Sequence, residues 1–222
     1  MVERLLRQFA GFGYERVKPP LVEFEDGLLA GTGTALAPQT FRLMDPVSQR
    51  MMGIRADITP QIARIAQSRL AKAPRPLRLS YTGDVLRVRG SQLRPERQFV
   101  QVGAELIGVE STTADAEIVL MAAEALTAIG VTRLSIDLAL PTFVPTVARE
   151  LGLDDAATQV ARAALDHKDG PALAALPESE RQLMRGLLDA TGPADTAAEA
   201  LTALALPPEA AALAREARAL SF

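Results

Sequence analysis

The sequence predicts an α+β fold, in which an antiparallel sheet with flanking helices is followed by a small all-α domain. Two observations lead to this prediction. Apolar and polar residues alternate over residues 77–88 and again over 99–107, as in strands with one buried face. From residue 142 onward, the chain is rich in alanine and leucine without alternation, and proline and glycine divide it into short helical segments. The expected domains are residues 1–140 and 141–222.

Composition is that of an ordinary globular protein. Hydrophobic residues make up 48% and charged residues 23% of the 222 residues, so a packed core is expected. No apolar run reaches the roughly 18 residues that a membrane span needs, and the first ten residues do not resemble a signal peptide, so we expect a cytoplasmic location without membrane contact. The absence of cysteine and the single His167 exclude disulfides and the common zinc sites, and no metal or other cofactor is expected.

Charge is distributed unevenly along the chain. Residues 1–108 contain 16 Lys or Arg against 10 Asp or Glu, whereas residues 109–222 contain 8 against 17. A basic first half fits a phosphate-bearing ligand. One short loop holds four arginines, Arg87, Arg89, Arg94 and Arg97. They raise the alternative of a nucleic-acid-binding module, but the loop lacks the interleaved aromatic residues of such modules, and no nucleic acid is expected.

The first elements follow from local signals. Residues 3–10 are predicted to be helical, and residues 14–22 to be extended up to Pro19-Pro20. Residues 23–53 are predicted to be loop with short extended pieces. This loop includes the GTGTAL segment at Gly31, which lacks the strand-to-helix context of a phosphate-binding loop.

The next elements form the expected centre of the fold. Thr59 and Pro60 predict a helix start, with threonine as the cap and proline in the first turn. The strands at 77–88 and 99–107 are joined by a loop, so an antiparallel hairpin is the simplest connection. A helix capped at Ser111 is predicted to pack against the sheet, and residues 133–138 are predicted to be a further strand.

One face of the second strand is a candidate ligand site. Gln101, Gly103 and Glu105 lie on the same side because side chains alternate along a strand. The glycine leaves space between an amide and a carboxylate, and such a pair can hold an ammonium group by charge-assisted hydrogen bonds. A half-solvated polar face of an antiparallel sheet is the alternative.

Several segments resemble the class II aminoacyl-tRNA synthetase core, in its histidyl branch. The opening helix and the strand ending in Pro19-Pro20 resemble motif 1, which builds the dimer interface in that family. IRADITPQIARIA resembles the family's LRPEGT segment, and LSYTGDVLRVRGSQLRPERQFVQVGAELIG resembles motif 2 with its RQF-x-Q-x-G-x-E ending. Together with FEDGLL, these segments resemble the regulatory subunits of short-form ATP phosphoribosyltransferases more closely than true histidyl-tRNA synthetases.

The resemblance implies roles for particular residues. Residues 1–140 would form a partial class II synthetase-like core containing motifs 1 and 2, and the helical remainder would be an insertion-like domain. Four residues would bind the ammonium end of histidine, namely Asp57, Thr59, Gln101 and Glu105.

Three further positions correspond to the ATP site of the synthetases. Arg87 would bind a phosphate or another anion, and Phe99 corresponds to the aromatic residue that packs against adenine. Arg89 departs from the pattern, because a synthetase has at that position a glutamate that helps to read adenine. The reversed charge argues against ordinary ATP recognition.

The resemblance also implies a function without catalytic residues in this chain. No segment resembles the LVRGLDYY motif, motif 3 or an anticodon-binding domain, and we interpret the sequence as truncated. Without the arginine of motif 3, charge that develops during amino-acid activation would lack a partner. The implied protein is a non-catalytic regulatory subunit. It would act with the catalytic subunit of ATP phosphoribosyltransferase, as a homodimer within a hetero-oligomer, with histidine as feedback effector. A fragment of a histidyl-tRNA synthetase catalytic core is the alternative.

Overall fold

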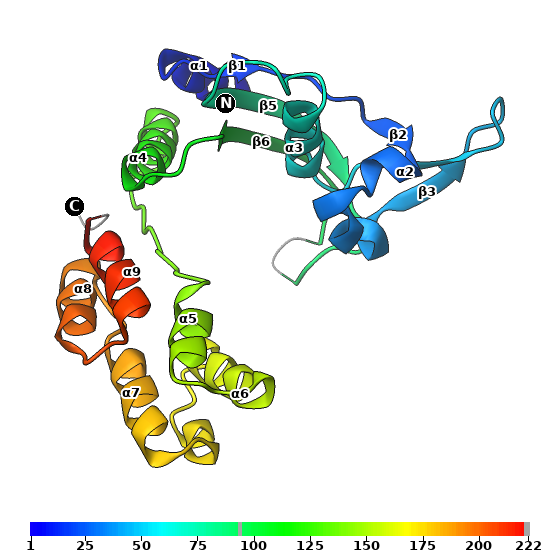
Figure 1. The fold of residues 1–222 in the computed structure, drawn as a ribbon. Coiled ribbons are helices and arrows are strands. Elements are labelled where there is room, and N and C mark those ends of the chain that lie inside the picture. Colours follow the sequence, from blue (N-terminus) through cyan, green and yellow to red (C-terminus); the bar gives the residue numbers. More distant parts are fainter. Residues whose placement is uncertain (93–94, 220–222) are drawn as a thin grey trace. The chain divides into compact units, whose positions relative to one another are not determined.

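The computed structural model describes residues 1–92 and 95–219, and the chain divides into two compact units, residues 1–134 and 135–222 (Figure 1). The sequence predicts a domain boundary slightly later, after residue 140. Each unit has a hydrophobic core of its own.

The first unit is built on a three-stranded sheet with the strand order β1-β5-β6. Strands β5 (Leu77–Leu86) and β6 (Gln98–Ile107) form the antiparallel hairpin that the sequence predicts, and Tyr81 lies opposite Gly103 in its register. Strand β1 (Glu15–Arg16) pairs in parallel with β5, so the predicted extended segment 14–22 contributes only two residues to this sheet.

Helix α3 (Thr59–Gln67) covers one face of this sheet. Ile58 and Ile62 are completely buried in a cluster with Leu79 and Val85 of β5. Because these strand residues have odd numbers, the even-numbered residues of the hairpin point to the opposite face.

Helix α1 (Val2–Gly11) covers that opposite face, where Val102 and Ala104 pack against its cluster. Helix α4 (Thr112–Ala128) packs chiefly against α1, through Met121 and Ala125. The prediction that this helix lies directly on the sheet is therefore only partly right, because α1 takes much of the apolar surface.

Residues 22–54 form a second small sheet, in which the short extended pieces predicted within a loop are paired strands. Its strands β2 (Val22–Phe24), β4 (Met51–Ile54) and β3 (Phe41–Met44) are antiparallel, in the order β2-β4-β3. Helix α2 (Glu25–Leu28) and the 3₁₀ helix η1 (Gly31–Gln39) lie between β2 and β3. The strands are too short to show a recognisable alternation, which is why the sequence predicted extended pieces here but not their pairing into a sheet.

The second unit is helical, as the sequence predicts. Its core includes Phe143, Val147, Leu173, Met184 and Leu187, which are all buried. The helices are α5 (Phe143–Glu150), α6 (Asp155–Asp166), η2 (Pro171–Ala175), α7 (Glu178–Asp189), α8 (Ala194–Ala203) and α9 (Pro208–Ala219).

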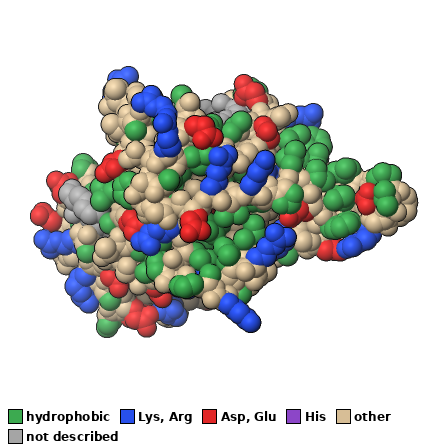
Figure 2. Space-filling model, turned by 90° about the horizontal axis from the view of Figure 1, so that it is seen from above, with side chains coloured by type: hydrophobic (Ala, Val, Ile, Leu, Met, Phe, Trp, Pro, Cys, Tyr) green, Lys and Arg blue, Asp and Glu red, His purple; other side chains and the backbone are tan. Residues whose placement is uncertain are grey.

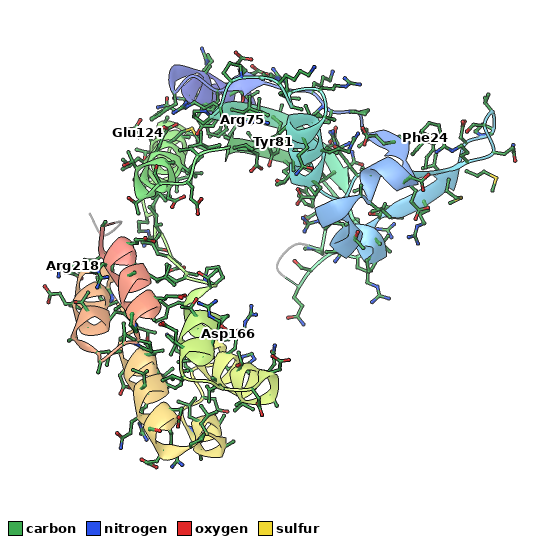
Figure 3. All side chains as sticks on the ribbon, in the orientation of Figure 1. Phe24, Arg75, Tyr81, Glu124, Asp166 and Arg218 are labelled. Atoms are coloured by element: carbon green, nitrogen blue, oxygen red, sulfur yellow. The ribbon has the colours of Figure 1, made fainter. Side chains whose placement is uncertain are left out.

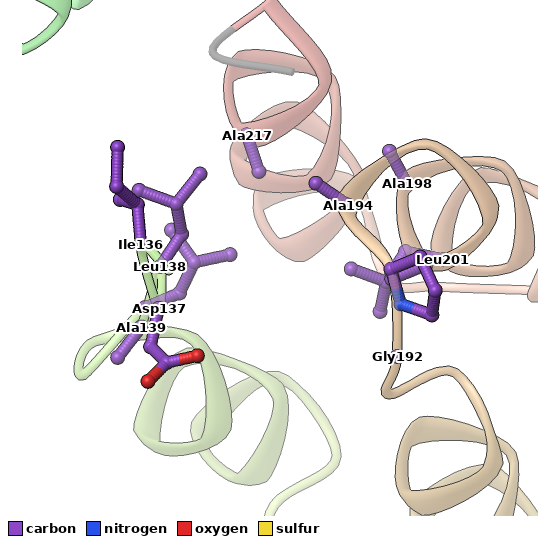
Figure 4. A pocket seen from close by; sticks show the side chains of 12 residues that line it. Ile136, Asp137, Leu138, Ala139, Gly192, Ala194, Ala198, Leu201 and Ala217 are labelled. Carbon is purple, nitrogen blue, oxygen red and sulfur yellow. The ribbon is translucent and has the colours of Figure 1, made fainter. Parts of the chain in front are cut away.

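The strand predicted over residues 133–138 is absent. Among the described residues no strand pairs with this segment, and Leu134, Ile136 and Leu138 are 39%, 53% and 49% exposed. Residues 136–140 instead line a cavity of about 380 Å³, together with side chains of α8 and α9 (Figure 4). Alternation describes how side chains would face in a strand, but a strand also needs a partner.

The described helices give no candidate for a membrane span, because none combines sufficient length with sufficient apolar character. On the face that Figure 2 shows, Lys and Arg side chains are interspersed with Asp and Glu side chains rather than gathered in one basic surface.

Candidate functional site

The start of α3 is held against β6 by two polar side chains. The amide of Gln101 accepts a hydrogen bond from the Ile58 backbone N–H (3.0 Å) and donates one to Asp57 Oδ1 (3.1 Å). The same Asp57 oxygen accepts from the Thr59 backbone N–H (2.9 Å). Asp57 and Gln101 therefore satisfy backbone donors that a helix start leaves open, and they fix the position of the helix.

Thr59 is the first residue of α3 and not its cap. Its hydroxyl donates to Glu105 Oε1 on β6 (2.9 Å) and lies 2.8 Å from the hydroxyl of Tyr81 on β5. The predicted capping role is wrong, because α3 already includes Thr59 and the Thr59 hydroxyl bonds to Glu105 instead of to a backbone N–H of the first turn. The Thr59 side chain is thereby available to the candidate site.

Thr59, Tyr81 and Glu105 form a triangle of oxygen atoms, since the Tyr81 hydroxyl also donates to Glu105 Oε1 (3.0 Å). The triangle has three oxygen–oxygen contacts but only two hydroxyl protons. One contact therefore lacks a proton, and the group can accept a hydrogen bond from a further donor. An ammonium group is such a donor.

Gly103 does not leave the empty space that the sequence suggested. A Cβ atom at this position would lie 2.4 Å from both Cζ and the hydroxyl oxygen of Tyr81, whose ring occupies the gap. Figure 3 labels Tyr81 on β5, the strand paired with β6. The interpretation of Gly103 as room for a ligand is wrong, because the opposite strand fills that room with its own side chain.

Burial distinguishes Tyr81 from its partners. Tyr81 is only 3% exposed, whereas Asp57, Thr59, Gln101 and Glu105 are each partly exposed. Burial and the nearby Glu105 carboxylate raise the pKa of Tyr81 above its ordinary value, although its hydrogen bond with Thr59 acts in the opposite direction. The phenol therefore stays protonated at neutral pH and acts as a donor to Glu105.

Arg87 lies beside this group rather than within it. Its guanidinium donates to the Ala56 carbonyl (3.2 Å), lies 3.7 Å from Asp57 Oδ2 and sits 5.2 Å from the centre of the Phe99 ring. Its charge partly balances Asp57, while Glu105 forms no ion pair with any residue in the described ranges.

The residues that correspond to the adenine position surround a separate small cavity. This cavity of about 90 Å³ is lined by Arg87, Arg89 and Phe99, and also by Gln39 and Glu96. Arg89 is exposed and brings positive charge to the place where the resemblance expects an acidic side chain. The fourth arginine of the loop, Arg94, lies outside the described residues.

Arg55 is a buried residue whose role the sequence did not reveal. It is 5% exposed and donates to the backbone carbonyls of Asp84 (2.8 Å) and Pro19 (2.9 Å), and burial lowers the pKa of its side chain. These bonds compensate for the cost of burying a charge. They fix the chain two residues before Asp57.

The site thus brings together the four residues proposed for the ammonium end, Asp57, Thr59, Gln101 and Glu105. The sequence missed Tyr81, which it placed only as a strand residue. The hairpin register was the available signal, since it sets a tyrosine opposite the glycine of the same face. No group of three or more metal-binding side chains occurs in the part of the chain that the structure describes.

The fold is that of the class II aminoacyl-tRNA synthetase-like proteins. A Bacillus halodurans structure, described as an ATP phosphoribosyltransferase regulatory subunit/histidyl-tRNA synthetase, matches with a TM-score of 0.80 over 98% of this chain and 57% of that chain, at 24% identity. The chain belongs to the histidyl-tRNA synthetase family, because the model of that family matches residues 1–221.

Relatives in this family resemble the chain closely in sequence. The ATP phosphoribosyltransferase regulatory subunit of Rhodospirillum centenum is 58% identical over 93% of this chain and 54% of its own length. That of Paramagnetospirillum magneticum is 56% identical over 96% of this chain and 56% of its own length. The resemblance to these regulatory subunits is confirmed, and the chain spans about half the length of these relatives.

Proposed function

We propose that this chain is part of a non-catalytic regulatory subunit of ATP phosphoribosyltransferase, which acts with a separate catalytic subunit in the first step of histidine biosynthesis. The names of its relatives support this role. Arg89 supports it further, because a positive charge at the adenine position disfavours the ATP recognition of a synthetase. The expected location is the cytoplasm, and the expected assembly is a homodimer within a hetero-oligomer.

Histidine is the proposed effector, and its ammonium group is proposed to bind at Asp57, Thr59, Gln101 and Glu105. The observation that carries this proposal is the oxygen triangle around Glu105, which lacks one proton and has no cationic partner among the described residues. A ligand ammonium group supplies both a donor and a positive charge.

Regulation would follow from linkage between two binding events. If histidine favours one arrangement of the regulatory and catalytic subunits, then the catalytic subunit must change the affinity for histidine by the same factor. An unchanged histidine affinity upon addition of the catalytic subunit, with inhibition still present, would place the effector site elsewhere.

Isothermal titration calorimetry of the full-length protein with histidine tests the site. The Glu105→Gln variant keeps the shape of the side chain and removes its charge. Because hydrogen bonds to charged groups contribute about 1.5–3 kcal/mol, we expect histidine binding to weaken about tenfold or more. Glu124→Gln is the matched control, since Glu124 is exposed on α4 and bonds only to Gln8 among the described residues. Equal affinities of both variants and the wild type would rule out Glu105 as a ligand.

A fragment of a histidyl-tRNA synthetase catalytic core is the second candidate, because a synthetase would share the same polar group. Histidine-dependent exchange between pyrophosphate and ATP separates the two candidates in the full-length protein. The regulatory role predicts no exchange above background, and exchange at ordinary enzymatic rates would establish the synthetase.

A further inference from the structure

Tyr81 is the most deeply buried member of the polar group, with 3% of its surface exposed. Its ring lies over Gly103 at a distance that excludes any side chain there. Its hydroxyl reaches from β5 to both Thr59 and Glu105. The ring therefore fills the space between α3 and β6. Its hydroxyl contacts one residue of each element, Thr59 of α3 and Glu105 of β6.

The chain contains a second tyrosine–glutamate pair, which provides a comparison. The Tyr14 hydroxyl donates to Glu117 (3.2 Å), and burial raises the pKa of Tyr14 to about 12, so both tyrosines remain protonated. Glu117 also receives two hydrogen bonds from the Arg78 guanidinium, at 2.9 and 2.8 Å. A cation thus completes this pair from within the protein.

The Tyr81–Glu105 pair has the same arrangement without the cation. Glu105 accepts from two neutral hydroxyls, and within residues 1–92 and 95–219 it forms no ion pair. It is partly exposed, so a ligand can approach it. A carboxylate held in place by two hydroxyls is preorganised for a cation, because the ordering of the side chain has taken place before binding.

We propose that Tyr81 is a positioning residue for histidine: its hydroxyl holds the Glu105 carboxylate in the orientation that receives the ligand's ammonium group. This inference rests on the proposed function of the site. It makes Tyr81 a determinant of selectivity for ligands with an ammonium group, acting through Glu105 and without contact to the imidazole or carboxylate of the ligand.

The test compares two ligands on the full-length protein by ligand-observed NMR competition, which measures weak affinities. Histidine carries the ammonium group, and 3-(imidazol-4-yl)propionate lacks it. Tyr81→Phe removes only the hydroxyl and keeps the ring over Gly103. We expect this variant to bind histidine about two- to tenfold more weakly, because the Glu105 side chain must then be ordered when the ligand binds, and to bind the propionate with unchanged affinity. Tyr14→Phe, which removes the hydroxyl of the other pair, is expected to leave both affinities unchanged.

The outcomes separate the inference from the function on which it rests. An equal loss for both ligands in Tyr81→Phe means that the hydroxyl only maintains the structure, and this overturns the inference. An unchanged histidine affinity overturns it as well. In both cases the wild type still binds histidine and the proposed function stands, whereas a wild type that does not bind histidine contradicts both.

Discussion

Gly103 shows how a single position can be constrained by contact instead of by backbone conformation. It lies in the middle of β6, and the space above its Cα is taken by the Tyr81 ring. The sequence identified the glycine and the two polar residues beside it, but it assigned the space to a ligand. The register of the hairpin decides whether the space above Gly103 is empty, because it determines which side chain of β5 lies opposite that glycine.

Gly103→Ala is expected to destabilise the protein, because the added methyl group would displace a buried ring. Overpacking of this kind costs about 1–3 kcal/mol. Chemical denaturation of the purified variant measures the loss, and Gly27→Ala serves as the control, since a Cβ at Gly27 meets no atom within 4 Å. A variant as stable as the control would show that Tyr81 moves aside without cost.

Two helix starts in the first unit, those of α3 and α4, differ in how far along the chain their hydrogen-bond acceptors lie. Ser111 caps α4 locally, accepting from the Ala114 backbone N–H (3.2 Å). The start of α3 depends on Gln101, a residue of β6 that is distant in the sequence. Local capping was predicted from the sequence, whereas a cap from another strand depends on the tertiary structure.

Ser111→Ala is expected to lower the free energy of unfolding by about 1 kcal/mol, since the Ala114 N–H loses its side-chain partner. Thermal or urea unfolding gives the value. Ser111→Asp, which retains an acceptor at the helix start, should restore most of the stability. A Ser111→Asp variant as unstable as Ser111→Ala would contradict the capping explanation.

Alternation gave a correct strand in one place and an incorrect one in another. Residues 99–107 and 133–138 show the same pattern, but only the former pair with a neighbour, β5. The pattern records which side chains are apolar. It contains no information on whether a second strand is present to accept the backbone hydrogen bonds.

At the scale of the whole molecule, the chain consists of two units with separate cores. Among the described residues of the second unit, every helix except α8 contributes to the main buried cluster. The buried side chains of this cluster are Phe143, Val147, Ala161, Ala164, Leu173, Leu176, Met184, Leu187, Ala210 and Ala214. A unit with its own core meets the main condition for independent folding.

A polypeptide of residues 135–222 is therefore expected to fold by itself. Its circular dichroism should be helical, and it should unfold cooperatively with temperature. In this polypeptide Met184→Ala, which removes a completely buried side chain, should lower stability by about 2–5 kcal/mol. Gradual unfolding without a transition would show that this unit needs the rest of the protein.

The sequence by itself determined the helical second unit, the β5–β6 hairpin, the capped start of α4 and the set of polar residues on one face of β6. Each depends on patterns within a few residues, such as periodicity, caps and turns. The tertiary structure alone decided that Tyr81 fills the place above Gly103, that Thr59 turns its hydroxyl to Glu105, and that residues 22–54 form a second sheet. These features depend on which segments meet in space, and strand register and pairing across long stretches of chain are set by packing of the whole unit.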